Sequence, residues 1–211
     1  MIIKTFIKPP IENNNYLIID EETKKAALVD CSSFDNEIIN SLEEQKAELE
    51  YILLTHGHFD HIMGINNLLE YFDEKNIKRP IIYIHKEDIR QMELSNQYLS
   101  YLEMPGIKIP KADKYIEDNE IIKLGNTIIK VIHTPGHTQG SVCYLAGNDL
   151  FSGDTIFREC VGRCDLEGGD FTQIVESIKS RIFTLPDDVK IYPGHGSFTT
   201  VGWEKINNNF T

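Results

Sequence analysis

Residues 55–61 read Thr-His-Gly-His-Phe-Asp-His and so bring three histidines and one aspartate into one short segment. Neutral imidazole and carboxylate are the ligand types that suit zinc and related divalent metals. The segment follows an apolar run of strand length, 51–54, and precedes apolar residues at helical spacing, Ile62, Ile65, Leu68 and Leu69. Ligands on a short loop at the end of a strand can be both preorganised and open to a substrate. The sequence therefore predicts a metal site at this position.

Further candidate ligands follow in similar settings. Residues 131–138 begin as a strand and break at Pro-Gly, which leaves His137 on a tight loop. Residues 190–196 repeat this pattern around His195, and an apolar run ends in Gly-Asp at Asp154. Seven candidate ligands thus lie at strand-to-loop transitions: His56, His58, Asp60, His61, His137, Asp154 and His195. Seven ligands are too many for one tetrahedral ion and fit two ions that share a carboxylate.

The elements that must position these ligands fall into two similar halves. Strands are expected at 1–8, 16–20, 26–29, 51–54 and 81–85, and then at 120–124, 127–132, 141–145, 150–151 and 189–192. Helices are expected at 34–48, with Ser33 as N-cap, and near 62–74, 87–94, 170–184 and 202–208. Residues 98–114 are expected to form a long loop over the site. Two groups of strands, each followed by helices, indicate an α/β fold of the αββα sandwich type with the metals at the strand ends.

Composition limits the class of protein. At 211 residues with 41% apolar side chains, the chain can bury one large core, so residues 1–211 are expected to form a single domain. The net charge of −12 argues against partners such as nucleic acid or an anionic membrane. No stretch has the length and apolarity of a membrane span, and the first ten residues do not resemble a signal peptide. These features predict a cytoplasmic protein.

Some histidines and cysteines are expected to lie outside the site. His85 and His133 are predicted to have structural roles. The four cysteines show no C-x₂-C spacing, so a separate zinc knuckle is not expected. Cys160 and Cys164 are predicted to be two separate free thiols, and a redox pair is the alternative. Three other side chains, those of Asp30, Thr55 and Thr134, either hold ligand histidines and loops by hydrogen bonds or are ordinary turn residues.

In their order and spacing, these motifs resemble those of the metallo-β-lactamase superfamily and, within it, the short glyoxalase II-like hydrolases of the hydroxyacylglutathione hydrolase type. The motifs are Val-Asp at 29–30, T-H-G-H-F-D-H at 55–61, H-T-P-G-H-T-Q-G-S at 133–141, S-G-D-T-I-F at 152–157 and P-G-H-G at 193–196. The resemblance implies a four-layer αββα sandwich. It also implies one metal on His56, His58 and His137, a second on Asp60, His61 and His195, and Asp154 as the bridge between them.

The resemblance further implies metal-dependent hydrolysis of a small-molecule acyl-thiol, such as the thioester S-(2-hydroxyacyl)glutathione. The cofactors would be two divalent ions, zinc first, with iron or manganese as alternatives. A water held by such ions has its pKa lowered from 15.7 to about 7, which supplies a hydroxide nucleophile without a serine or cysteine. The ions also polarise a carbonyl oxygen. Asp60 would act as the catalytic residue that orients the nucleophile and accepts its proton.

The chain departs from the larger glutathione-thioester hydrolases after Asp154. Those enzymes carry a Lys and Tyr pair in a G-K-F-Y-E-G stretch and continue into a helical segment that binds glutathione. Here the corresponding residues 162–170 read Gly-Arg-Cys-Asp-Leu-Glu-Gly-Gly-Asp, and the chain ends soon after His195. Recognition of glutathione is therefore left open. Arg163 is predicted to bind an anionic part of the substrate, and an ion pair with Asp165 or Asp170 is its other possible role.

Three other functions compete with hydrolysis of a thioester. A persulfide dioxygenase of the same superfamily would use one iron held by two histidines and one aspartate, and metal content with oxygen uptake would identify it. A class B β-lactamase of the most familiar type places a cysteine where this chain has Asp154. A non-enzymatic binding module would be expected to have lost metal ligands, whereas all seven are present here. The sequence therefore favours the hydrolase.

Overall fold

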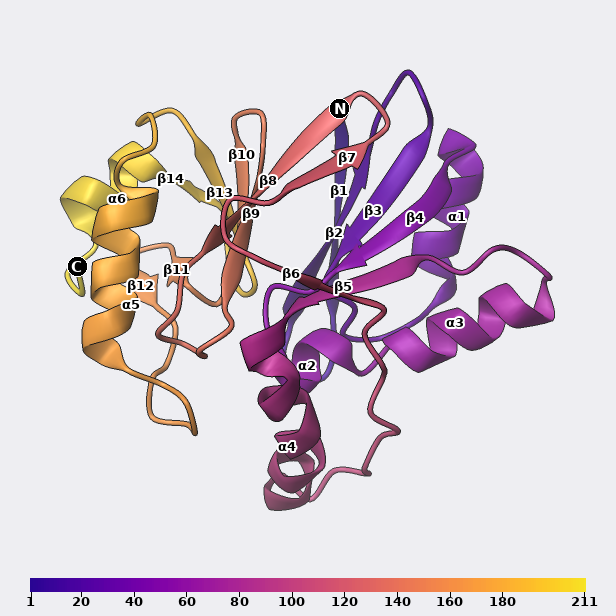
Figure 1. Ribbon diagram of the computed structural model, residues 1–211, viewed down its shortest axis with the longest axis horizontal. Coiled ribbons are helices and arrows are strands. Elements are labelled where there is room, and N and C mark those ends of the chain that lie inside the picture. Colours follow the sequence, from indigo (N-terminus) through magenta and orange to yellow (C-terminus); the bar gives the residue numbers. More distant parts are fainter.

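Two six-stranded sheets face each other in the computed structural model, which describes residues 1–211, and helices cover their outer faces (Figure 1). The first sheet has the order β1-β2-β3-β4-β5-β6, with β1 Ile2–Lys8, β2 Asn13–Ile19, β3 Lys25–Val29, β4 Glu48–Leu53, β5 Ile81–His85 and β6 Lys114–Ile116. The second has the order β14-β13-β10-β9-β8-β7, with β7 Ile121–Leu124, β8 Thr127–His133, β9 Val142–Ala146, β10 Asp149–Gly153, β13 Lys190–Pro193 and β14 Thr199–Thr200. A separate hairpin pairs β11 Ile156–Phe157 with β12 Cys160–Val161.

The helices form the two outer layers. The first half of the chain contributes α1 Asn36–Gln45, α2 Phe59–Ile62, α3 Ile65–Glu74, the 3₁₀ turn η1 Lys86–Asp88 and α4 Ile89–Tyr101. The second half contributes α5 Phe171–Ser177, the π-helical turn η2 Ile178–Ile182 and α6 Val201–Asn207. Helices α1 and α3 cover the first sheet, and α5 and α6 cover the second (Figure 1). The predicted αββα sandwich is confirmed. None of the helices is long and apolar enough to cross a bilayer.

Three buried apolar layers hold the sandwich together. Side chains alternate between the two faces of a strand, so in β2 Leu17 packs toward the helices while Tyr16 and Ile18 pack between the sheets. The layer between the sheets also contains Tyr144 and Phe151 from the second sheet. The third layer lies between the second sheet and its covering helices. Because the sheets pack against each other and are flanked by helices, a polar site fits best at the sheet edges and strand ends.

The topology brings the candidate ligands to one edge. Strands β3, β4, β5 and β6 run parallel to one another, and β10 runs parallel to β13. Their carboxyl ends lead into the segments that carry the histidines and aspartates. In open α/β sheets, ligands bind outside the carboxyl ends of the strands, and the two facing sheets place both sets of ends together.

Several predicted element boundaries were wrong. Helix α1 begins at Asn36 and is capped by Asp35, not Ser33, because the Asp35 carboxylate accepts a hydrogen bond from the backbone N–H of Glu37. The helix ends before Lys46, whose φ of 52° is left-handed. Asp60 lies in α2 and not in a loop before the helix. These boundaries depend on side-chain capping and on packing, which a hydrophobic pattern does not report.

The expected loop over the site is shorter than predicted. Helix α4 continues to Tyr101, well beyond the predicted end near residue 94, so Tyr98 is helical. Its last turns remain buried through Ser95 and Leu99, although the polar residues around them weaken the apolar period. The strands β6, β11, β12 and β14 were not predicted, because runs of two or three residues carry no detectable periodicity.

Candidate metal centre

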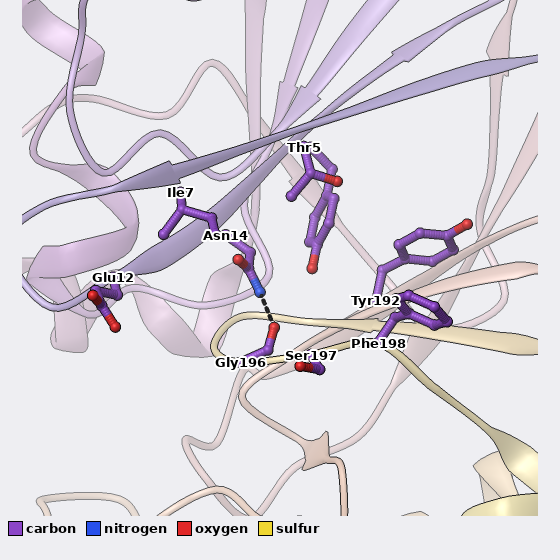
Figure 2. Close-up of a pocket in the computed structure, with 9 residues that line it drawn as sticks. Thr5, Ile7, Glu12, Asn14, Tyr192, Gly196, Ser197 and Phe198 are labelled. Carbon is purple, nitrogen blue, oxygen red and sulfur yellow. Dashed lines mark hydrogen bonds between the residues drawn. The ribbon is translucent and has the colours of Figure 1, made fainter.

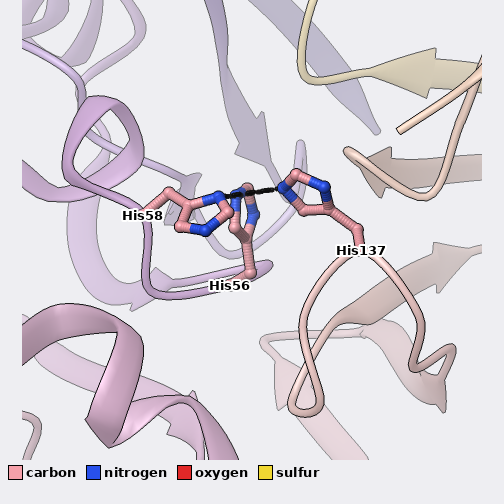
Figure 3. A group of neighbouring side chains, drawn as sticks. All are labelled: His56, His58 and His137. Atoms are coloured by element: carbon pink, nitrogen blue, oxygen red, sulfur yellow. Dashed lines mark hydrogen bonds between the residues drawn. The ribbon is translucent and has the colours of Figure 1, made fainter. Parts of the chain in front are cut away.

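Three histidine side chains converge at the first cluster, which comprises His56, His58 and His137 (Figure 3). His56 and His58 follow β4, and His137 comes from the loop after β8. The His58 Nδ1 atom lies 3.1 Å from His56 Nε2 and 2.9 Å from His137 Nε2, and the two Nε2 atoms are 3.2 Å apart. All three side chains are buried. The cluster thus presents three ring nitrogens to one another at the distances expected of ligands around one ion.

The proton positions in this cluster fit a bound cation. His137 Nδ1 lies 2.7 Å from the Arg163 carbonyl, which only accepts, so Nδ1 carries the proton and Nε2 a lone pair. His56 Nδ1 lies 3.1 Å from the Thr55 hydroxyl, whose own proton goes to the Asp30 carboxylate. His56 Nε2 therefore also carries a lone pair. Two lone pairs that face each other at 3.2 Å repel unless a cation lies between them, so these residues fit a divalent metal.

The second cluster comprises Asp60, His61 and His195. An Asp60 carboxylate oxygen lies 3.4 Å from His61 Nε2 and 3.2 Å from His195 Nε2. These residues come from α2 and from the loop after β13, so each cluster takes ligands from both halves of the chain. One carboxylate and two imidazoles form a second donor set suited to zinc, iron or manganese.

Asp154 lies between the two clusters. Its Oδ2 atom is 3.6 Å from His137 Nε2 in the first cluster and 3.6 Å from His195 Nε2 in the second. Its Oδ1 atom is 3.5 Å from His61 Nε2 and is buried without a hydrogen-bond partner. A buried carboxylate oxygen without a partner is costly. The carboxylate therefore fits a position in which it bridges two cations.

The two clusters differ in their affinity for protons. Burial and the neighbouring imidazoles lower the pKa of His58 to about 3, and the same causes lower the pKa of His56 well below its ordinary value. Burial also acts to lower the pKa of His61, but the Asp60, Asp30 and Asp154 carboxylates more than offset it and raise that pKa well above its ordinary value. In the first cluster His56 and His58 are therefore neutral, whereas a metal at the second cluster must displace the proton of His61.

Hydrogen bonds that the Asp30 carboxylate accepts hold the second cluster. The Asp30 carboxylate accepts from His61 Nδ1 at 2.8 Å, from the Thr55 hydroxyl at 2.8 Å and from the Thr55 backbone N–H at 2.8 Å. These bonds direct His61 Nε2 toward the cluster. Thr134 instead bonds to the hydroxyl of Thr155, beside Asp154. Of the two roles considered for Asp30, Thr55 and Thr134, the structure favours the supporting one.

Sequence reasoning missed Asp88, which joins two ligand loops. This fully buried carboxylate accepts from the Gly57 N–H at 2.6 Å, the Gly140 N–H at 2.7 Å and the Thr138 hydroxyl at 2.9 Å. Gly57 lies between the two histidines of the first cluster, and Thr138 follows His137. In the sequence, Asp88 is only one member of a charged Lys-Glu-Asp run, so no local signal distinguished it.

Three consecutive asparagines, Asn13, Asn14 and Asn15, were also missed. Asn13 Nδ2 lies 2.8 Å from His61 Nε2, and Asn15 donates to the Ser32 hydroxyl. Asn14 donates to the Pro193 carbonyl at 3.0 Å and to the Gly196 carbonyl at 2.8 Å, and so holds the loop that carries His195; Figure 2 shows the bond to Gly196. All three are buried. The cavity beside Asn14, of about 380 Å³, contains none of the seven candidate ligands.

The remaining histidines and the cysteines lie outside the two clusters. His85 and His133 stack on each other with ring centroids 4.3 Å apart, and His133 Nε2 lies 2.8 Å from the Gln139 carbonyl. With Glu87 they form a separate, more exposed group whose ligand atoms lie within 4.8 Å of one another. Cys160 and Cys164 are free thiols in this structure.

A second cavity, of about 530 Å³, opens onto both clusters. The candidate ligands His58, Asp60, His137, Asp154 and His195 form its floor, and most of its remaining lining is apolar. Arg163 also lines it, but two guanidinium nitrogens bond the Asp165 carboxylate at 2.7 and 2.8 Å. The cavity therefore combines a polar floor, an apolar wall and one cation that already has a partner.

Comparisons with known proteins agree with this architecture. Hydroxyacylglutathione hydrolase GloC of Haemophilus influenzae is 32% identical over 94% of this chain and 92% of its own length. The B3 metallo-beta-lactamase BLEG-1 has a TM-score of 0.88 at 32% identity, with 99% of each chain covered. TTHA1623 in a di-iron-bound form has a TM-score of 0.85 at 30% identity, with 99% of this chain and 100% of that chain covered. The sequence model of the metallo-beta-lactamase superfamily matches residues 9–195, and the chain belongs to that superfamily.

Proposed function

We propose that this protein is a hydrolase with two divalent metal ions that cleaves a small-molecule thioester, such as S-(2-hydroxyacyl)glutathione or a related acyl-thiol. The observation that carries the proposal is the Asp154 carboxylate between the two donor sets, one oxygen of which is buried without a hydrogen-bond partner. We also propose that residues 1–211 act as one domain, which is supported by ligands from both halves of the chain in each cluster. Zinc is the first choice of metal on ligand type, and the di-iron form of a relative makes iron the alternative.

Each candidate residue has a defined part in the proposed reaction. His56, His58 and His137 would hold one ion, Asp60, His61 and His195 would hold the other, and Asp154 would serve both. When bound, the ions supply Lewis acidity and a water of lowered pKa. Burial acts to raise the pKa of Asp60, but His61 and His195 more than offset it, so the carboxylate is ionised at neutral pH. Asp60 is therefore able to orient the attacking water and to accept its proton.

Arg163 is proposed to bind an anionic group on the thiol part of the substrate. Its position in the lining of the cavity supports this role. Because its guanidinium is exposed and paired with Asp165, a substrate anion has to replace the Asp165 carboxylate. The net gain from such an exchange is smaller than that from a free guanidinium.

The proposal is tested with protein stripped of metal by a chelator and then reconstituted with zinc or iron. Thioester, lactone and β-lactam substrates are compared, and oxygen consumption is followed with glutathione persulfide. We expect thioester hydrolysis that is lost on stripping and restored by metal, with no oxygen uptake. Oxygen uptake by a form with one iron would favour the dioxygenase, and preferential β-lactam hydrolysis would favour a lactamase. Absence of every activity in protein that holds two ions would favour a binding module.

A further inference from the structure

The cavity that opens onto both clusters has exposed apolar side chains in its wall. Ile11 is 50% exposed and Leu102 is 54% exposed, and both line the cavity together with the partly buried Leu166 and Tyr98. Apolar side chains that gather around a cleft indicate the chemistry of what the cleft binds. They come from three separate segments, and none of them is needed to hold a metal.

The surroundings of this wall disfavour anions. Ile11, Leu102 and Leu166 are each followed directly by an exposed glutamate, at positions 12, 103 and 167. The one cation in the lining, Arg163, is held by two hydrogen bonds from its guanidinium to Asp165. The whole chain carries a net charge of −12. A carboxylate placed against the apolar wall would lose its hydration without gaining a free partner, which is costly.

We infer that the apolar wall binds the acyl group of the substrate and selects acyl groups that are uncharged and apolar. This inference rests on the proposed thioester hydrolysis. In that reaction the carbonyl of the substrate would lie at the two metal clusters, and the acyl chain would extend from there along the wall of the same cavity. Common thiol carriers are charged or strongly polar, so the acyl group is the part of a thioester that fits this wall. Arg163 is left to contact the thiol part.

The first test is hydrolysis of acetyl, butanoyl, hexanoyl and octanoyl thioesters of one common thiol. Full burial of a methylene corresponds to about a fourfold gain, so kcat/KM is expected to rise about two- to fourfold per methylene until the cavity is filled. A succinyl thioester, which matches butanoyl in length but ends in a carboxylate, is expected to be at least about tenfold poorer than butanoyl. A flat chain-length series, or a preference for succinyl, would overturn the inference.

Two substitutions provide a matched comparison. Leu102→Asp puts a carboxylate on the cavity wall, whereas Tyr101→Asp makes the same kind of change at the preceding position, which is 72% exposed and does not line the cavity. We expect Leu102→Asp to reduce kcat/KM for the hexanoyl thioester about tenfold or more and to leave the acetyl thioester much less affected. Tyr101→Asp should change neither. Equal effects of the two variants would contradict the assignment of the wall.

A binding measurement separates this inference from the proposed reaction. Calorimetry measures the binding of butanoate, hexanoate and octanoate to metal-loaded protein. The carboxylate of each compound is expected to bind the metals, and its alkyl chain is expected to contact the apolar wall. Affinity that rises with chain length and is weakened by Leu102→Asp supports the apolar wall, even if no thioester is hydrolysed. If thioesters are hydrolysed but neither binding nor kcat/KM depends on chain length, the inference about the wall is contradicted and the proposed function still stands.

Discussion

The hydrogen bond between Asp30 and His61 allows a direct test of how the second metal site is held. In Asp30→Asn, the side chain keeps its size, and asparagine tolerates the left-handed backbone that Asp30 adopts at φ 58°. The amide oxygen can still accept from the Thr55 N–H, as Asp30 Oδ1 does now. The amide nitrogen, however, replaces the oxygen that lies 2.8 Å from His61 Nδ1, so that two donors face each other.

His61 has two responses, and both weaken metal binding. It can keep its proton on Nδ1 and lose the hydrogen bond, or it can move the proton to Nε2, the atom that faces Asp60 and Asp154. Loss of a carboxylate behind a metal-binding histidine lowers metal affinity by about 10- to 100-fold. This corresponds to about 1.4–2.7 kcal/mol. The first site, on His56, His58 and His137, should be weakened less, because the Thr55 hydroxyl loses its bond to Asp30 Oδ2 but can still accept from His56 Nδ1.

The assay is a competition titration of metal-free protein against a chromogenic chelator, which resolves the two binding steps. Parallel titration of His195→Ala identifies the step that belongs to the second site. Asp118→Asn is the matched control, because the Asp118 carboxylate also accepts from a backbone N–H, that of His133, but lies outside both clusters. Equal weakening of both steps in Asp30→Asn, or no weakening of either, would refute the reasoning.

Three further outcomes are expected. Asp154→Ala should lower metal occupancy and reduce hydrolysis by at least about a hundredfold, whereas His133→Ala should keep both ions. Equal loss of metal in the two variants would mean that the ligands are misassigned. His61 and His195 have pKa values raised above 6.5, mainly because nearby carboxylates outweigh burial. Metal analysis across a falling pH series should therefore show the second ion lost first, with proton competition beginning above pH 6.5. Arg163→Ala should raise KM for a thioester with an anionic thiol group about tenfold and leave kcat nearly unchanged. An equal rise in KM for a thioester with a neutral thiol group would mean that Arg163 has only a structural role.

The candidate ligands could be predicted because their signals are local. Each follows a short apolar run or a Pro-Gly break, and parallel strands such as β10 and β13 then bring the ends of such runs to one edge. The same local signals located most strands, since a short apolar run such as the one in β2, a strand that is buried throughout, is visible in the sequence itself.

Asp88 and Asn14, which also hold the ligand loops, could not be found in this way. Asp88 bonds to Gly57, 31 positions earlier, and to Gly140, 52 positions later. Asn14 reaches Gly196 across 182 positions. A polar side chain gains such a role only from tertiary packing, so its residue type and neighbours give no indication. The end of α4 was missed for the related reason that burial by tertiary contacts overrides a weak local pattern.

The measurement that tests the central claim most directly is the metal content of protein purified without chelators, combined with the metal–metal distance in a crystal structure of that protein. We expect close to two ions per chain, about 3.5–4 Å apart, with Asp154 in contact with both. A fully loaded preparation with one ion, held by His56, His58 and Asp154 with or without His137, would contradict the dinuclear site and favour the iron dioxygenase.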